Sequence, residues 1–124
     1  MAGNFWSASE MLERVRSGEI ESKELGVKWS YLNRGAYCTL NCVLVSNPKG
    51  IPLHTHEDHD EVIQVLDGEC EAVIGDERRL LKKGDTFFVP KGIPHKVGNI
   101  CTLLSIYGPA FDPEKPDRKF LEKF

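Results

Sequence analysis

Short apolar runs separated by turn-forming residues fill most of this chain of 124 residues. From residue 37 to residue 107 the runs are rich in β-branched, aromatic and leucine side chains, and Gly, Pro, Asn or Asp residues interrupt them at short intervals. This spacing is typical of an all-β barrel or sandwich, and there is no repeat and no strand–helix–strand alternation. We expect one domain, with an N-terminal helix and arm in residues 1–35, a barrel in residues 36–108 and a tail in residues 109–124.

The sequence predicts one short helix before the strands. Ser7 and Glu10 form a capping box, an apolar stripe follows, and Gly18 ends the helix. Residues 19–24 are polar, so we expect them to be solvated. The expected strands cover residues 27–32, 37–46, 61–66, 69–74, 78–81, 86–89 and 101–107. The run 37–46 is largely apolar on both faces and should be buried on two sides, whereas residues 108–124 should wrap the barrel as a tail.

Composition excludes several classes of partner. The net charge is −3 and no cluster of Lys or Arg stands out, so we expect no nucleic-acid partner. No apolar stretch approaches the ~20 residues of a membrane span, and the N-terminus lacks the pattern of a secretory signal, which predicts a cytoplasmic protein without membrane contact. The four cysteines match no zinc pattern and are expected to be buried, small apolar residues.

Residues 54–61, with the sequence HTHEDHDE, contain three of the four histidines. His54 and His56 are two apart, so on a strand both side chains point to the same face. Residues 57–60 can turn the chain back, and Glu61 opens the next apolar run, so a hairpin would place Glu61 beside His56. Two imidazoles and a carboxylate suit a divalent transition metal. His59 lies in the turn and is expected to have a plain loop role; the alternatives are support of a metal ligand or contact with substrate at the rim.

A second motif lies between residues 84 and 99, where a rigid loop delivers the fourth histidine. Its fixed positions are Gly84, Pro90, Gly92, His95 and Asn99. Together with His54, His56, Glu61 and Gly68, this spacing resembles the two conserved motifs of the cupin family. The chain departs from the first motif in one place, since Pro48 stands where a glycine is usual and Gly50 follows two residues later.

The resemblance to cupins implies a small antiparallel β-barrel of two facing sheets, a double-sheet jelly roll, often paired as a homodimer. It also implies one divalent transition metal, held by His54, His56, Glu61 and His95. This donor set does not distinguish Fe, Mn, Ni, Co and Zn.

The resemblance leaves three functions open. The first is a metal-dependent enzyme of the dioxygenase, isomerase or lyase type, which binds and transforms a small oxygenated organic molecule. The second is a non-catalytic cupin that binds or senses a small molecule, and the third is a storage or structural cupin. His59 and Tyr107 are the candidate catalytic residues, and Tyr37, Phe87 and Phe88 are further aromatic residues on strands that could line the cavity.

Overall fold

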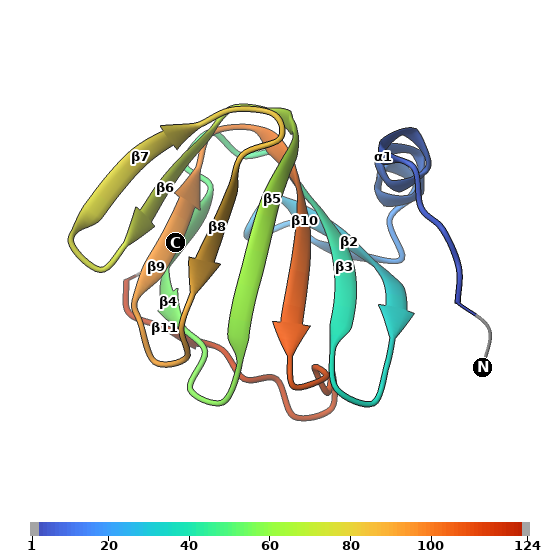
Figure 1. Cartoon of the computed structure of the whole chain (residues 1–124). Coiled ribbons are helices and arrows are strands. Elements are labelled where there is room, and N and C mark those ends of the chain that lie inside the picture. The colour runs from blue at the N-terminus through green and yellow to red at the C-terminus, as the bar shows by residue number, and fades with distance from the viewer. Residues whose placement is uncertain (1–2, 123–124) are drawn as a thin grey trace.

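The computed structural model describes residues 3–122, which form two antiparallel sheets and a short helix (Figure 1). The six-stranded sheet has the order β1-β2-β3-β10-β5-β8, with the bounds Ile20–Ser22, Val27–Arg34, Thr39–Val45, Cys101–Gly108, Asp60–Gly68 and Thr86–Val89. The five-stranded sheet has the order β11-β4-β9-β6-β7, with the bounds Lys119–Phe120, Ile51–Thr55, His95–Gly98, Cys70–Ile74 and Glu77–Leu81. The expected all-β, double-sheet jelly roll is confirmed.

The two sheets face each other and enclose the main apolar core. Its buried members come from both sheets: Val45, Ile63, Val65, Cys70, Ala72, Val97, Cys101 and Leu103. They follow the period of two that places alternate side chains of a strand on the inner face. Full burial of one such aliphatic side chain stabilises the fold by about 1.5–3 kcal/mol.

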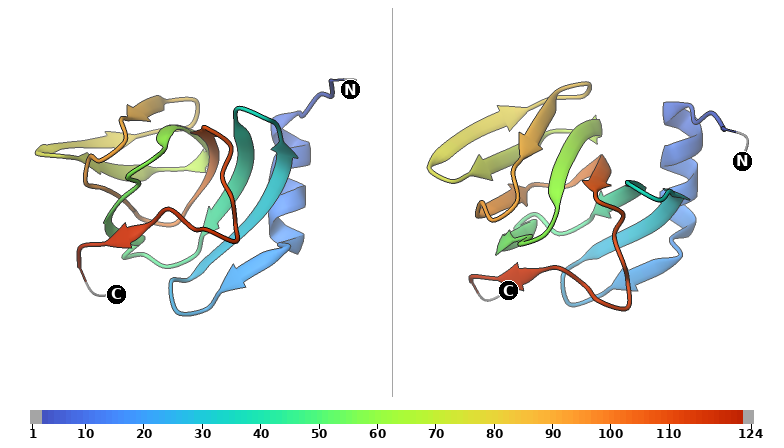
Figure 2. Two further views of the ribbon diagram at one scale, coloured as in Figure 1. Left: turned by 90° about the horizontal axis from the view of Figure 1, so that it is seen from below. Right: turned by 60° about the horizontal axis from the view of Figure 1, so that its bottom comes forward.

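The helix α1 (Ala8–Ser17) covers the outer face of the six-stranded sheet, over β2 and β3 (Figures 1 and 2). Ser7 caps it as expected, because its hydroxyl accepts from the backbone N–H of Glu10 and the Glu10 carboxylate accepts from that of Ser7. Met11 and Val15 pack against Cys42 on β3, while Val45 of the same strand faces the main core. Strand β3 is therefore buried on two sides, as its apolar pattern predicted. No helix among residues 3–122 is both long and apolar enough to cross a bilayer.

Gly50 lets β4 begin directly against β9. Its φ is +73°, and a Cβ atom at this position would lie 1.8 Å from the carbonyl oxygen of Val97. A residue other than glycine would therefore push β9 away at the strand that carries His95. The glycine that the cupin motif leads one to expect at position 48 is thus found at position 50, with a required role in the packing.

Residues 109–122, here called the C-terminal strap, cross one end of the barrel and then join the five-stranded sheet (Figure 2). Strand β11 pairs with β4, with Lys119 opposite Thr55 and Phe120 opposite His54. Phe111, near the start of the strap, is buried. The strap therefore closes the end of the barrel where the histidines lie.

Residues 20–22, expected to be polar and solvated, form the edge strand β1, because they pair with β2 through Ile20 opposite Trp29. Two local expectations were wrong. Cys38 is exposed, whereas the other three cysteines are buried. Tyr37 is 87% exposed and precedes β3, so it does not line a cavity.

Candidate metal centre

The four predicted ligand residues come from both sheets and meet at one end of the barrel. His54 lies on β4 and stands directly opposite His95 on β9, and His56 follows the end of β4. Glu61 lies on β5 of the other sheet. The three histidines bring one ring nitrogen each within 4.8 Å of one another, and the Glu61 carboxylate lies 3.3 Å from Nε2 of His56 and of His95. The pair formed by His56 and Glu61 is the contact that the hairpin predicted.

Backbone carbonyl groups fix the orientation of all three imidazoles. Nδ1 of His54 lies 2.8 Å from the oxygen of Pro52, Nδ1 of His95 lies 3.0 Å from that of Ile93, and Nδ1 of His56 lies 2.6 Å from that of Asp117. A carbonyl oxygen only accepts, so each Nδ1 carries the proton and donates. In a neutral ring this leaves the lone pair on Nε2, which is the arrangement found for metal-bound histidine.

These Nε2 lone pairs and the Glu61 carboxylate need a cation between them. Nε2 of His56 is buried and has no hydrogen-bond partner among the described residues. Its neighbour at 3.3 Å is a carboxylate oxygen, which cannot donate. Buried acceptors that face one another are unfavourable unless a proton or a metal ion lies among them. The donor set therefore fits a divalent transition metal, with three imidazole nitrogens and one carboxylate oxygen.

Burial and neighbouring charges shift the pKa values of the residues in this centre. Burial lowers the pKa of His54 to about 3, with the neighbouring His95 adding to the effect, so this ring stays neutral at ordinary pH. Burial alone would lower the pKa of His56, but the negatively charged carboxylate of Glu61, 3.3 Å away, outweighs burial and raises that pKa. Burial alone would raise the pKa of Glu61, but the adjacent imidazole rings of His56 and His95 hold it below its usual range. Glu61 therefore remains a buried anion.

Ser105 on β10 holds the Glu61 carboxylate in place. Its hydroxyl donates to Oε2 of Glu61, and both side chains are buried. Oε1 is the oxygen that faces His56 and His95. Ser105 thus satisfies one carboxylate oxygen and leaves the other for the centre.

His59 joins the turn between β4 and β5 to the C-terminal strap. Its Nδ1 lies 2.6 Å from Oδ2 of Asp117, and its Nε2 lies 3.3 Å from the carbonyl oxygen of Ala110. The Asp117 carboxylate also accepts from the backbone N–H groups of Glu57 and Asp58. Burial alone would raise the pKa of Asp117, but the hydrogen bond with His59 and these two backbone bonds lower it. His59 is 8% exposed, so it is a buried anchor and not the plain loop residue expected.

A cavity of about 80 Å³ lies beside the metal centre, between the sheets. His54, Glu61 and His95 form part of its wall. Most of the remaining wall is apolar: Leu25, Val27, Trp29, Val43, Ile51, Ile63, Val97, Leu103 and Phe111. Besides the candidate ligands, polar groups in this wall come from Tyr31, Asn41, Ser105, Tyr107 and Arg118. The space is large enough for several water molecules or a small organic ligand.

Tyr107 is the predicted catalytic candidate that lines this cavity. Its ring lies edge-on to His56, with 5.2 Å between the ring centroids. Burial, with the negative charge of Glu61 adding to it, raises the pKa of Tyr107 above its usual value. The phenol is therefore protonated and able to donate a hydrogen bond. Of the other aromatic candidates, Phe87 packs against the core and Phe88 is 53% exposed.

The sequence reasoning missed four residues around the centre: Asn41, Ser105, Asp117 and Arg118. For Asn41 and Ser105 a signal was present, since both are polar residues at inward-facing positions of otherwise apolar strands. Asp117 and Arg118 lie more than fifty residues from the histidine cluster, and nothing in the local pattern of the tail indicates that it returns to β4.

Comparison with known proteins agrees with this architecture. A family model described as cupin domain matches residues 43–107. The chain is 34% identical over 118 residues to a quercetin 2,3-dioxygenase of Bacillus subtilis, covering 79% of the chain but only 35% of that protein. It is also 33% identical over 106 residues to an uncharacterized protein of Aquifex aeolicus, covering 83% of each.

A solved structure gives the same result for the fold. The chain resembles an RmlC-like cupin from Shewanella frigidimarina with a TM-score of 0.67 and 25% identity, over 81% of this chain and 91% of that one. Two motifs, two facing sheets and a matching family model converge on one assignment. The chain belongs to the cupin family.

Proposed function

We propose that this protein is a metal-dependent enzyme that binds and transforms a small oxygenated organic molecule. The single observation that carries the proposal is the convergence of three imidazoles beside a buried carboxylate, with the Nε2 lone pairs turned away from the backbone. His54, His56, His95 and Glu61 are the proposed ligands. A divalent metal bound there would polarise a substrate oxygen or, as iron, support chemistry with dioxygen.

The cavity favours a reactive site over a purely structural one. Structural metal sites are closed by protein ligands, whereas catalytic sites keep a position open. Here the wall formed by His54, Glu61 and His95 faces a space that other side chains do not fill. A substrate in that space would lie next to the metal and would be shielded from bulk water by apolar walls.

The chain's own residues supply two further functions. Tyr107 is placed to donate a hydrogen bond to a substrate oxygen, since its phenol is protonated and lines the cavity. His59 does not line the cavity, and its Nδ1 is engaged by Asp117. We therefore assign His59 a positioning role, through the strap, and keep Tyr107 as the catalytic candidate.

A dioxygenase reaction is the first to test, because one relative is named quercetin 2,3-dioxygenase. The chain spans about a third of that relative, so its substrate is not transferred to this protein. Isomerase and lyase reactions are the other candidates within the same proposal.

Metal analysis of anaerobically purified protein, combined with oxygen uptake on a substrate panel that includes quercetin, tests the proposal. Bound iron with substrate-dependent oxygen uptake supports a dioxygenase. Bound zinc, nickel, cobalt or manganese without oxygen uptake favours an isomerase, a lyase or a binding protein. Protein that takes up no divalent metal from any of these salts would contradict the proposal.

A further inference from the structure

Arg118 extends from the C-terminal strap to the wall of the cavity. The residues on either side fix its backbone: Asp117 accepts hydrogen bonds from the β4–β5 turn, and Lys119 pairs with Thr55. Arg118 itself is half-buried and forms part of the cavity wall together with Tyr107. Arg118 shares this wall with His54 and Glu61, which places it beside the metal centre.

The guanidinium of Arg118 forms neither an ion pair nor a hydrogen bond with any residue in the range 3–122. Three carboxylates in this part of the described chain have other partners. Glu61 is held by Ser105, Asp117 accepts from His59, and Glu122 accepts from the backbone N–H of Leu53. A cation that faces an enclosed space normally has a partner, because lost hydration must be replaced. An anion inside the cavity would supply the partner that Arg118 lacks among residues 3–122.

Asn41 on β3 provides a second, independent observation. Its side chain is 4% exposed and lines the cavity, and its Oδ1 has no hydrogen-bond partner among the described residues. A buried amide oxygen is normally satisfied by a donor. Asn41 therefore offers an acceptor to a hydroxyl or N–H group of a molecule bound in the cavity.

The wall around these two polar groups is apolar, with Val27, Ile51 and Leu103 among its members. A ligand that satisfies all three features has a charged acidic end, an apolar carbon skeleton and a donor group. The balance of charges around the cavity also favours an acidic ligand. A divalent metal and Arg118 together outweigh the single negative charge of Glu61, so an anionic ligand is attracted and a cationic one is repelled.

We infer that the cavity takes a small organic acid, whose anionic group is recognised by Arg118 and whose hydroxyl or N–H group donates to Asn41. This inference deepens the proposed function, because it names the substrate class of the same site. It does not depend on the identity of the metal or on the reaction.

Calorimetric titration with matched ligands tests the inference. The probes are ω-hydroxycarboxylic acids of graded chain length, their neutral ω-hydroxycarboxamides, and the corresponding acids without the hydroxyl group. Each is titrated into the zinc-loaded and the metal-free protein. We expect at least one hydroxy acid to bind, and its amide to bind about tenfold more weakly or worse.

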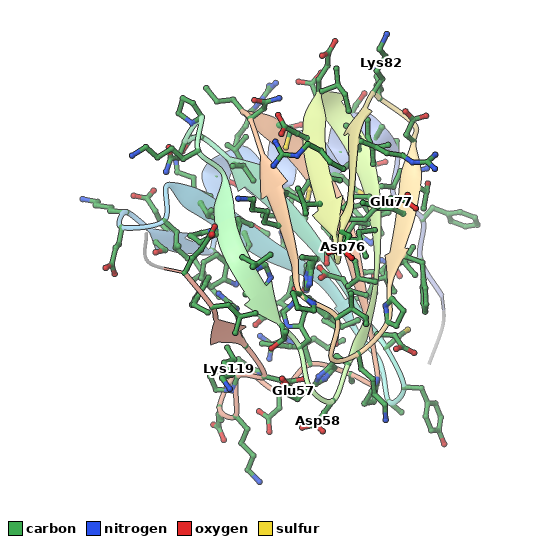
Figure 3. All side chains as sticks on the ribbon, turned by 90° about the vertical axis from the view of Figure 1, so that its left-hand side faces the viewer. Glu57, Asp58, Asp76, Glu77, Lys82 and Lys119 are labelled. Atoms are coloured by element: carbon green, nitrogen blue, oxygen red, sulfur yellow. The ribbon has the colours of Figure 1, made fainter. Side chains whose placement is uncertain are left out.

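Variants identify the residues that carry this preference. Arg118→Gln should reduce the affinity for the acid about tenfold and leave the affinity for the amide unchanged. Arg118→Lys should recover part of the loss, because the charge returns without the bidentate geometry. Lys119→Gln is the matched control, because Lys119 is the next residue in the chain and its side chain is exposed. It lies at the same end of the molecule as Glu57 and Asp58 (Figure 3). Asn41→Leu should abolish the preference for the hydroxyl group.

Several results would overturn the inference. Equal binding of acids and amides, equal affinities of the Arg118→Gln and Lys119→Gln variants, or no binding by any acid would each do so. The number of zinc ions bound per chain, measured on the same samples, distinguishes a failure of the organic-acid inference from a failure of the proposed metal-dependent function. Zinc uptake without acid binding leaves the metal site standing, whereas acid preference without zinc uptake supports the inference and contradicts the metal site.

Discussion

The backbone carbonyl oxygen of Asp117 accepts a hydrogen bond from Nδ1 of His56 at 2.6 Å. A residue of the C-terminal strap thus orients a proposed metal ligand that lies 61 positions earlier in the chain. The side chain of Asp117 strengthens the same connection, because it accepts from His59 and from two backbone N–H groups of the β4–β5 turn. The end of the barrel and the metal centre are therefore built as one unit.

Asp117→Asn should weaken metal binding without unfolding the barrel. The amide loses the charge that holds His59 and the turn, so the carbonyl that orients His56 becomes less well fixed. Groups that orient a metal ligand typically contribute about 10–100-fold to metal affinity. Competition with a chromophoric chelator measures this affinity. Asp76→Asn is the control, because Asp76 lies in the β6–β7 turn (Figure 3), and equal affinities for the two variants would contradict the role of Asp117.

Ser105→Ala should destabilise the metal-free protein. The substitution removes the donor to Oε2 of Glu61 and leaves a buried carboxylate oxygen without its partner. We expect a loss of about 1–3 kcal/mol in the free energy of unfolding, measured by urea denaturation. Ser46→Ala, which removes a hydrogen bond at the exposed surface, should cost less. A larger loss for Ser46→Ala than for Ser105→Ala would show that Ser105 does not support Glu61.

Protonation of His54 in the unfolded chain should reduce the stability of the metal-free protein as the pH falls below about 6.5, which is the ordinary pKa of a histidine side chain. The pKa of His54 is lowered to about 3 by burial, so below pH 6.5 the unfolded chain binds a proton that the folded chain does not. This difference destabilises the fold by up to about 2 kcal/mol between pH 6.5 and pH 5. Above pH 6.5 the His54 contribution is constant, because the ring is neutral in both states.

Other groups also change protonation in the acidic pH range, so the contribution of His54 is measured by comparing the parent with His54→Gln. The raised pKa of His56 acts in the opposite direction, since its contribution is present below pH 6.5 and is lost as the pH rises through its folded value. The depressed pKa of Glu61 contributes stability above about pH 4.5 that is lost as the pH falls. The difference in unfolding free energy between the parent and His54→Gln should therefore shift against the parent on acidification. A pH-independent difference would mean that His54 is not a buried neutral ring.

The convergence of the four proposed ligand residues could be predicted from sequence because the geometry that joins them is mostly local. The period of a strand places His54 and His56 on one face, a four-residue turn returns Glu61, and a loop stiffened by Pro90 and Gly92 delivers His95. The double-sheet architecture followed from turn spacing and from the family resemblance. These features involve residues that are close in the chain or in a fixed motif.

The rest of the site depends on long-range packing that a local pattern does not contain. The pairing of Phe120 with His54 brings Asp117 and Arg118 to the centre, and the sequence of the tail does not specify that register. The expectation for His59 was wrong for the same reason, because its buried environment is created by the strap. Cys38 and Tyr37 were misplaced because β3 begins at Thr39, two residues later than the apolar run suggested.

The metal content of the parent and of His56→Ala, each purified anaerobically and measured by elemental analysis, tests the central claim most directly. We expect one divalent transition metal ion per chain in the parent and a sharp loss in the variant, because His56 supplies a buried nitrogen that has no hydrogen-bond partner among residues 3–122. Circular dichroism should show the same β-sheet spectrum for both, since the apolar core does not include His56. Equal metal content in the two folded proteins would contradict the assignment of these residues as a metal centre.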